Sequence, residues 1–434
     1  MAAEEKMHLL NLQILLKKNR FIMFPTGFYR DENGELNVQG IKIDALTAKY
    51  GTPLFIYDTG LMKERYELFL NTVKNVKGNI HYAVKANDSV NIIKFFGELG
   101  AGADIVSIGE FYKCVAAGIT PDKIIFSGVG KDKNEIETAL RNNILQFNIE
   151  SEEELYDIYK IAKKLKIVAN ICLRINPDIA AESHPYIETG KADCKFGISE
   201  EEALTLAKKY GTEKINLVGV SAHIGSQITN TDLLVEAYEK LENLADQLVA
   251  LGFEIDHIDV GGGLAIDYEL EKNFSPNELI KKLKKFSSKY ALTLEPGRSI
   301  VAQAGVLITK VLGIKENGSQ KFLIVDAGMN DLIRPSLYSA RHKIENLVES
   351  SEKKDLCSVV GPVCETADSF GSDFEVSANA GDYLVVYSAG AYGSSMGSNY
   401  NTRLKPAEIL VDKKSHKVIR KSETFDDLIK EEEL

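Results

Sequence analysis

Strand-like and helix-like segments alternate eight times between residues 79 and 297, and this alternation constrains the fold more than any other feature. Each expected strand is a short run rich in β-branched and apolar residues, and a longer charged segment with helical periodicity follows it. The expected strands span residues 79–84, 103–106, 123–127, 145–149, 169–175, 217–224, 257–260 and 292–295. This pattern predicts a parallel sheet, and eight repeats predict an α/β fold with a (β/α)₈ barrel.

The segments between the strands begin and end as helices do. Ser151 and Ser199 each precede three glutamates, which is typical of a capped helix N-terminus. The expected helices span residues 89–99, 110–117, 134–141, 152–165, 200–210, 231–251 and 277–288. A doubly wound open sheet is the alternative, and we favour it less because no GxGxxG motif opens a helix after the first strand.

The chain has 434 residues, which exceeds the size at which one core stops growing and favours two domains. After about residue 305, strand-like runs separated by turns predict a mostly antiparallel β domain. These runs span residues 306–312, 322–325, 358–360, 382–388 and 408–411, and similar runs lie at 34–43 and 52–57. We therefore expect a barrel over residues 53–304 and a C-terminal β domain over 305–434, completed by the N-terminal segment 20–52.

Charge and cysteine usage exclude several classes of partner. The formal net charge is −11 and no dense run of Lys or Arg occurs, which argues against nucleic acid. The five cysteines form no CxxC pair, which argues against a disulfide framework and a metal site and suits the cytoplasm. The N-terminus is acidic where a signal peptide is basic, and the leucine-rich stretch 9–16 predicts a short packing helix rather than a membrane anchor.

Lys85 ends the first expected strand, within the sequence Tyr82-Ala-Val-Lys-Ala-Asn87. A strand end is rigid, and we expect apolar walls to lower the pKa of this amine because they disfavour its charged form. A neutral, positioned amine forms a Schiff base with a carbonyl, including the aldehyde of pyridoxal phosphate. Alone, Lys85 would instead be interpreted as a solvated lysine just past a strand.

Unusual residues also end four further strands, and barrel enzymes carry their chemistry at these ends. These residues are Arg174, His223, the glycines 261–263 and the segment Glu295-Pro-Gly-Arg298. The three glycines remove side chains, so that backbone N–H groups can approach a phosphate. Ser226 and the backbone of Gly297 and Arg298 offer further donors.

Glu295 and His223 fit the ring of such a cofactor. A carboxylate facing a pyridine nitrogen keeps that nitrogen protonated, and the ring then becomes an electron sink. His223 opens a Gly-Ser loop and could stack on a flat ring. The alternatives are a salt bridge between Glu295 and Arg298 and a histidine that serves only the packing of the strand end.

With further motifs, this set resembles the alanine-racemase-like decarboxylases that use pyridoxal phosphate, and most closely the branch that acts on diaminopimelate. The matching motifs span residues 82–87, 102–107, 223–227, 261–263, 295–298, 326–335, 361–365 and 390–393. One motif departs from the family, since the chain reads Ser107-Ile-Gly-Glu110 where Gly-Gly-Glu often follows the Val-Ser. We expect a local loop change there rather than loss of function.

The resemblance implies a role for each matching residue. Lys85 would carry the Schiff base, Glu295 would face the ring nitrogen, His223 would stack on the ring, and Cys364 would return a proton to the substrate carbon. The implied cofactor-binding residues are Lys85, His223, Ser226, Gly262, Gly263, Glu295, Pro296, Gly297, Arg298 and Tyr392. The implied substrate-binding residues are Arg298, Arg334, Tyr338, Glu365 and Tyr392. The resemblance also implies a homodimer in which Cys364 and Glu365 reach the neighbouring active site.

The implied reaction is decarboxylation of meso-2,6-diaminopimelate to L-lysine and CO₂, the last step of lysine biosynthesis. A racemase of this fold would place an arginine where the chain has Glu295, and a non-catalytic relative would be expected to lack Lys85 or Cys364. A decarboxylase of ornithine, arginine or carboxynorspermidine stays open, because it shares the cofactor machinery. Arg334 and Glu365 favour diaminopimelate, whose distal end carries both a carboxylate and an amine.

Overall fold

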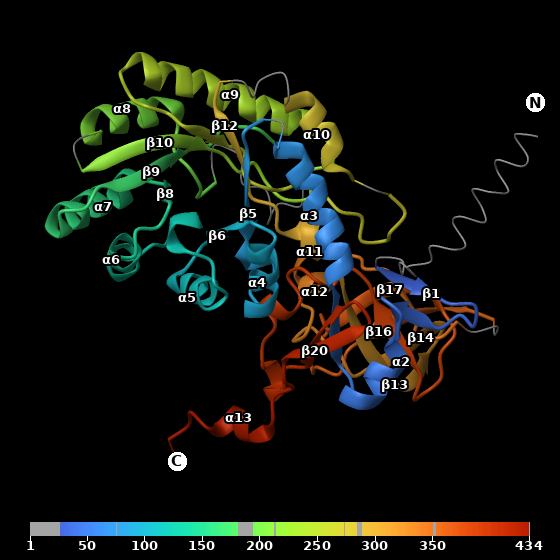
Figure 1. Cartoon of the computed structure of the whole chain (residues 1–434). Helices are drawn as coiled ribbons and strands as arrows, with labels where there is room; N and C mark the ends of the chain where they lie inside the picture. The colour runs from blue at the N-terminus through green and yellow to red at the C-terminus, as the bar shows by residue number, and fades with distance from the viewer. Residues whose placement is uncertain are drawn as a thin grey trace, which may run out of the picture.

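The computed structural model describes residues 27–433, apart from residues 75, 181–193, 212–213, 273, 284–288 and 350–352. The short helix expected at 9–16 and the first residues of the segment 20–52 lie outside this range. A helix-ringed barrel, coloured from cyan to yellow, stands above a sheet-rich part built from the orange and red C-terminal residues and the blue N-terminal strands (Figure 1).

The barrel is closed and its strands are parallel. The eight strands are β5 (Asn79–Ala83), β6 (Gly102–Ile105), β7 (Ile124–Phe126), β8 (Gln146–Ile149), β9 (Ala169–Arg174), β10 (Ile215–Ser221), β11 (His257–Asp259) and β12 (Ala291–Leu294). The last strand, β12, pairs with the first, β5, which closes the sheet. The (β/α)₈ barrel is therefore confirmed, and the open-sheet alternative is wrong.

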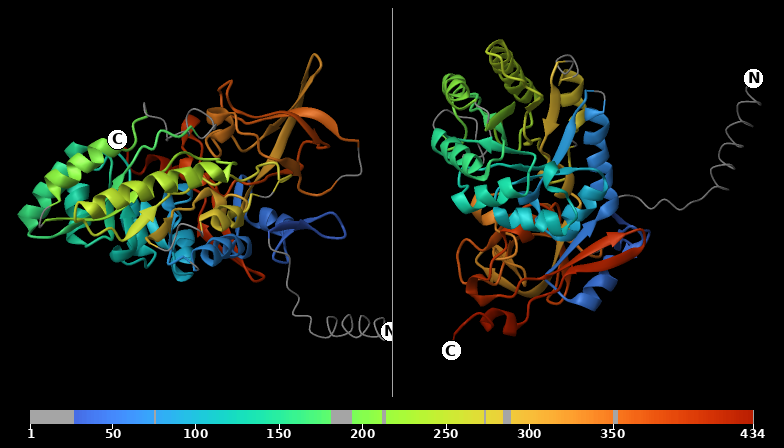
Figure 2. Two further views of the ribbon diagram at one scale, coloured as in Figure 1. Left: turned by 90° about the horizontal axis from the view of Figure 1, so that it is seen from above. Right: turned by 60° about the vertical axis from the view of Figure 1, so that its left-hand side comes forward.

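Helices surround the barrel, as a second view shows (Figure 2). They are α3 (Thr59–Val73), α4 (Val90–Glu98), α5 (Ile108–Ala116), α6 (Lys133–Arg141), α7 (Glu152–Leu165), α8 (Glu200–Tyr210), α9 (Thr231–Ala250) and α10 (Pro276–Leu283). The expected caps are confirmed, because the side chains of Ser151 and Ser199 accept hydrogen bonds from the N–H groups of Glu154 and Glu202. No helix among the described residues is long and apolar enough to cross a membrane.

The side chains that face the barrel axis are polar. On β5, His81 lies between the core residues Ile80 and Tyr82, and on β11 Asp259 follows the core residue Ile258. Successive strand residues point to opposite faces, so these polar side chains point inward while their apolar neighbours pack against the helices. The apolar walls that we expected around Lys85 are therefore absent on the inner side, where buried carboxylates stand instead.

The second sheet has nine strands. They are β4 (Leu54–Asp58), β13 (Gly305–Asn317), β14 (Gln320–Val325), β15 (Ile344–Asn346), β16 (Asp355–Val360), β17 (Ser369–Val376), β18 (Tyr383–Val386), β19 (Ala407–Asp412) and β20 (Ser415–Arg420). The pairs β14–β16 and β4–β19 are parallel, and the other pairs are antiparallel. The mostly antiparallel second sheet is thus confirmed.

The N-terminal residues pack on this second sheet. The strands β1 (Phe28–Arg30), β2 (Leu36–Val38) and β3 (Ile41–Lys42) form a small antiparallel sheet, followed by α2 (Ile43–Tyr50). Leu36 and Ile43 share a core with Val306 and Val385 of the second sheet. Strand β4, within the range expected for the barrel, pairs with β13 and β19 instead. The proposed domain division at residues 53 and 305 therefore shifts β4 to the second sheet.

Short helices complete the chain and carry several candidate residues. They are η1 (Val84–Ala86), η2 (Pro121–Lys123), α11 (Arg298–Val301), α12 (Arg334–Tyr338), η4 (Ser394–Met396), η5 (Tyr400–Thr402) and α13 (Phe425–Ile429). The turn η1 follows β5 at the barrel mouth, and Tyr392 donates its backbone N–H to the carbonyl of Ala86 at 2.8 Å. This bond ties the loop before η4 to the turn that carries Lys85.

Candidate active site

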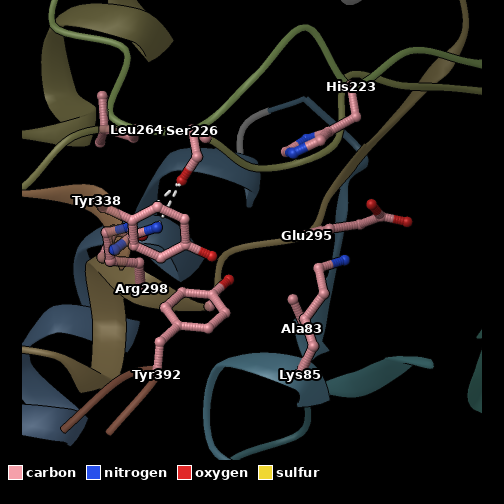
Figure 3. A pocket seen from close by; sticks show the side chains of 12 residues that line it. Ala83, Lys85, His223, Ser226, Leu264, Glu295, Arg298, Tyr338 and Tyr392 are labelled. Carbon is pink, nitrogen blue, oxygen red and sulfur yellow. Dashed lines mark hydrogen bonds between the residues drawn. The ribbon is translucent and has the colours of Figure 1, made fainter. Parts of the chain in front are cut away.

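A cavity lies at the C-terminal ends of the barrel strands, between the barrel and the second sheet. Its walls are Ala83, Lys85, His223, Ser226, Gly263, Leu264, Glu295, Gly297, Arg298, Ser299, Tyr338 and Tyr392. The tyrosines come from the C-terminal part, and the other residues come from the barrel (Figure 3). A second chamber shares Lys85, His223 and Glu295 with the first and continues toward Asn148 and Arg174. The structure thus gathers most of the sequence-predicted residues around one space.

Lys85 is paired in this cavity. Its Nζ donates a hydrogen bond to Asp104 Oδ2 at 2.9 Å, and Asp104 is fully buried. Burial lowers the pKa of the Lys85 amine, but the negative charges of Asp104, Tyr392 and Glu295 outweigh burial and raise this pKa above its ordinary value. The lowered pKa that we expected for Lys85 is therefore wrong for the protein without cofactor, because the sequence did not indicate the buried carboxylate of Asp104.

One end of the cavity is suited to a phosphate. Arg298 Nη2 donates to Ser226 Oγ at 2.9 Å, and the guanidinium lies 4.6 Å from the centre of the Tyr392 ring. Gly263 has a φ of +98°, and a Cβ there would collide with the carbonyl oxygen of Gly225. A Cβ on Gly297 would come within 2.9 Å of Ala86 Cβ. Both positions therefore require glycine, which leaves the backbone open to an anion.

The His223 ring is neutral. The N–H of Gly262 donates to His223 Nδ1 at 3.3 Å, so that this nitrogen acts as an acceptor. Burial, together with the positive charges of Lys85 and Arg174, lowers the pKa of His223 well below its usual range. A neutral imidazole at the cavity wall presents a flat, apolar face, and Figure 3 shows it on the same side of the cavity as Glu295.

Glu295 carries a buried carboxyl that has another carboxyl beside it. Burial raises the pKa of Glu295 well above its usual range, and the charges of Asp104 and Asp259 raise it further. A hydrogen bond joins the carboxyl groups of Glu295 and Asp259. The alternative salt bridge between Glu295 and Arg298 is not formed, because the Arg298 guanidinium donates to Ser226 and to the Tyr268 hydroxyl.

The departure from the family motif at residues 107–110 leads into a helix. Helix α5 begins at Ile108, and the Ser107 side chain accepts a hydrogen bond from the N–H of Glu110 at 3.3 Å. The Glu110 carboxyl accepts from the N–H of Val106 at 2.7 Å. Burial raises the pKa of Glu110 to about 7.

Arg334 stands behind the cavity wall. Its guanidinium lies 4.1 Å from the centre of the Tyr268 ring, and its Nη1 lies 2.8 Å from His342 Nε2. Burial lowers the pKa of His342 to about 3, so this ring is neutral; its Nδ1 donates to the carbonyl of Tyr387 and its Nε2 accepts from Arg334. The Nε of Arg334 is buried without an acceptor. Sequence reasoning missed Tyr268 and His342, because only the tertiary packing brings them to Arg334.

Cys364 and Glu365 lie apart from this cavity. Both are exposed in the loop between β16 and β17, and the N–H of Cys364 donates to Asn401 Oδ1 at 2.9 Å. Neither residue lines either chamber. Among the described residues, no group of three or more His, Cys, Asp and Glu side chains is arranged to hold a metal ion.

The side chains of the cavity fit pyridoxal phosphate. The amine of Lys85 can meet its aldehyde, the carboxyl of Glu295 can meet its ring nitrogen, and the neutral ring of His223 can lie on its face. Arg298, Ser226 and the crowded glycine backbone can meet its phosphate. Each of these contacts needs a different chemical group, and the cavity supplies one for each.

Comparison with known proteins gives a consistent result. Residues 59–302 match the family model described as "Pyridoxal-dependent decarboxylase, pyridoxal binding domain". The chain is 45% identical to a diaminopimelate decarboxylase from Aquifex aeolicus, over 92% of this chain and 96% of the relative. It is 43% identical to one from Neisseria meningitidis, over 88% of this chain and 95% of the relative.

Solved structures are similar over nearly the whole chain. A diaminopimelate decarboxylase from Helicobacter pylori, complexed with L-lysine, is 42% identical with a TM-score of 0.86, and the match covers 90% of this chain and 98% of that chain. One from M. jannaschii is 37% identical with a TM-score of 0.89, and the match covers 94% of this chain and 98% of that chain. The similarity thus extends over the barrel and the second sheet.

Proposed function

This chain belongs to the diaminopimelate decarboxylases among the pyridoxal-dependent decarboxylases, and we propose that it converts meso-2,6-diaminopimelate to L-lysine and CO₂. It is a pyridoxal phosphate-dependent carboxy-lyase that acts on a small amino acid. The observation that carries the proposal is the cavity in which Lys85, Glu295 and the phosphate-binding set around Arg298 surround one space. The reaction is the last step of lysine biosynthesis.

Lys85 attaches the cofactor, and Asp104 holds its amine in place until then. The 2.9 Å contact between Lys85 Nζ and Asp104 Oδ2 fixes the amine at the barrel mouth. Since an ammonium cannot attack an aldehyde, the Lys85 amine must first lose a proton, and Asp104 is an acceptor in direct contact with it. The bond from the N–H of Tyr392 to the carbonyl of Ala86 holds the turn on its other side.

The reaction chosen from that cofactor follows from Glu295. Bound pyridoxal phosphate supplies an electron sink for the pair of electrons left on the substrate's α-carbon when CO₂ departs. An ionised Glu295 keeps the ring nitrogen protonated, and this strengthens the sink. A racemase of this fold would use an arginine at that place. The carboxyl of Glu295 therefore supports decarboxylation rather than racemisation.

Arg334 selects the substrate by its distal carboxylate. It is 3% exposed, and its Nε has no acceptor in the described residues, so a carboxylate near it would find a preformed cationic partner. Tyr338, four residues further along α12, lines the cavity and connects Arg334 with it. Glu365 would meet the distal amine. Ornithine lacks the distal carboxylate and would leave Arg334 unpaired.

The second half of the reaction needs a proton donor, and we assign it to Cys364 of a neighbouring copy. Cys364 and Glu365 are exposed on their own chain, where they line neither chamber. An exposed thiol in a conserved-length loop of the second sheet can reach another copy's Lys85 only in an assembly, so we propose a homodimer with shared sites. The five cysteines are free, which suits a cytoplasmic location.

Release of CO₂ from a panel of amino acids tests this function. The purified enzyme with pyridoxal phosphate is given meso-diaminopimelate, ornithine, arginine and carboxynorspermidine in parallel. We expect CO₂ and an equal amount of L-lysine from diaminopimelate, with k_cat/K_M at least a hundredfold above that for ornithine, because a buried cation left unpaired is costly. A higher k_cat/K_M on any other member would replace diaminopimelate as the substrate.

A further inference from the structure

Two buried carboxyl groups share a hydrogen bond beneath the cavity. Asp259 ends β11 and is fully buried, and Glu295 follows the neighbouring strand β12. A hydrogen bond joins their carboxyl groups. Glu295 Oε1 and Asp259 Oδ2 are also buried oxygens to which no donor in the described residues points. Ionised carboxylates only accept hydrogen bonds, so the bond between these two oxygens requires one proton on the pair.

The charges around the pair explain why that proton stays. Asp104 lies near both carboxyls, Lys85 faces Glu295, and Arg174 faces Asp259. Burial raises the pKa of Asp259 to about 7 and that of Glu295 well above its usual range, so the proton rests on Glu295 in the protein without cofactor. Two adjacent buried carboxylates cannot both ionise at low cost.

Asp259 also holds the glycine turn beside the cavity. Its Oδ1 accepts the N–H of Gly261 at 2.8 Å, and the carbonyl of Gly261 accepts the N–H of Glu295 at 2.8 Å. The next residue, Gly262, donates to His223. One buried carboxyl is therefore connected to the ring-nitrogen partner, to the phosphate-binding turn and to the imidazole.

We propose that Asp259 is a positioning residue that keeps Glu295 ionised toward the cofactor's ring nitrogen. With a pyridinium N–H on the cavity side of Glu295, the proton of the pair crosses the hydrogen bond from Glu295 Oε1 to Asp259 Oδ2. Asp259 is then neutral and donates to Glu295, whose negative charge faces the ring. No proton enters or leaves the pair, and a single carboxyl is charged at any time.

This inference rests on the proposed function, because it needs bound pyridoxal phosphate. It makes different predictions for two substitutions of the same residue. Asp259→Asn keeps an N–H donor for Glu295 and a carbonyl acceptor for Gly261, so the amide reproduces a neutral aspartic acid. Asp259→Ala removes both and leaves Glu295 Oε1 buried without a donor, which favours the protonated form of Glu295.

The test is the protonation state of the ring nitrogen in the full-length holoenzyme, measured by ¹⁵N NMR with ¹⁵N-labelled pyridoxal phosphate. We expect a protonated nitrogen in the wild type and in Asp259→Asn, and an unprotonated one in Asp259→Ala. The dissociation constant of pyridoxal phosphate should rise on the order of ten- to a hundredfold in Asp259→Ala and stay within about threefold in Asp259→Asn. Asp331→Asn is the matched control, because Asp331 is also buried with a pKa raised to about 7 and lies outside the cavity walls. It should leave both readings unchanged.

Several outcomes would overturn the proposal. A protonated ring nitrogen in Asp259→Ala would show that Glu295 needs no neutral donor, and an unprotonated one in Asp259→Asn would show that the negative charge of Asp259 matters instead. If Asp259→Ala does not fold, the infrared difference between wild type and Asp259→Asn decides, since it must contain the C=O band of a protonated carboxyl at neutral pH. A wild-type protein that binds no pyridoxal phosphate would instead defeat the proposed function itself.

Discussion

At the scale of single residues, the pair of Lys85 and Asp104 sets the starting state of the enzyme. Asp104 is fully buried, and the 2.9 Å contact keeps the amine charged until the cofactor arrives. A strand-end lysine in an apolar wall would already be neutral, but it would have no fixed direction. The structure therefore favours positioning of the amine over a low pKa.

Removal of the Lys85 amine should abolish turnover. In the wild-type holoenzyme, borohydride should fix pyridoxal phosphate on Lys85, which peptide mass spectrometry would identify. Lys85→Ala should bind the cofactor loosely and release no measurable CO₂, while its circular dichroism spectrum stays that of the wild type. Label found on Lys113, whose amine pairs with Asp88 outside the cavity, would refute the assignment.

Arg334→Ala should discriminate between substrates. Loss of one partner of a buried, charge-assisted pair typically costs about 3–5 kcal/mol, so k_cat/K_M on meso-diaminopimelate should fall on the order of a hundredfold or more. Any weak activity on ornithine, which lacks the distal carboxylate, should change far less.

A surface arginine provides the control for this substitution. Arg341 pairs with Glu269 at 2.9 Å, and both side chains are exposed. Because exposed pairs contribute little, Arg341→Ala should leave k_cat/K_M on both substrates within about twofold. An equal loss on diaminopimelate and ornithine in Arg334→Ala would indicate a structural role for Arg334 instead of recognition of the distal carboxylate.

At the scale of elements, the sequence predicts the barrel strands to within about two residues, because each is a short apolar run bounded by charged helices. It does not predict the partner strands of Leu54–Asp58. This run is as apolar as a barrel strand, and only its pairing with β13 and β19 shows which sheet it joins. Pairing between distant segments is a tertiary property that local patterns do not contain.

The same reasoning explains which site residues were missed. Lys85, His223 and Glu295 are conspicuous because each follows an apolar run. Asp104 and Asp259 lie inside or at the end of such runs, where alternation along the strand marks them as inward-facing. That alternation was available in the sequence and could have identified both. The position of Tyr268 beneath Arg334 could not, because it depends on how a loop packs.

The glycine turn after β11 offers a prediction at this scale. Gly263→Ala should weaken binding of pyridoxal phosphate by tenfold or more, because a Cβ at φ +98° would be strained and would press on Gly225. Gly252 is the matched control: it has a φ of +95°, and a Cβ there would meet nothing within 4 Å. Gly252→Ala should lower the free energy of unfolding by about 1–2 kcal/mol and leave the cofactor's dissociation constant unchanged. Equal weakening in both variants would mean that strain alone, and not the turn, governs binding.

At the scale of the whole molecule, the cavity is built from two parts of the chain that lie far apart in the sequence. The barrel supplies Lys85, Glu295 and Arg298, and the C-terminal part supplies Tyr338 and Tyr392. The exposed loop with Cys364 and Glu365 contributes to neither chamber of its own chain. A site that needs this loop is therefore complete only when two copies associate.

Mixing of two inactive variants tests this assembly. Lys85→Ala and Cys364→Ala, carrying different affinity tags, are each inactive alone and are allowed to exchange subunits, with exchange followed by native mass spectrometry. In a mixed dimer, one of the two sites combines an intact Lys85 with an intact Cys364. Random exchange makes half of the dimers mixed, so activity should return to about a quarter of the wild-type value.

A second mixture makes the test specific for the shared site. Glu295 lies in the same cavity wall as Lys85 of its own chain, so a mixture of Lys85→Ala with Glu295→Ala leaves a defect in the barrel of every site. It should therefore regain no activity, even though the same subunits exchange. If instead both mixtures stay inactive after confirmed exchange, each site is built within one chain, and the proton donor must be sought among the residues that line the cavity, with Tyr392 first because it stands opposite Lys85 in the same wall (Figure 3).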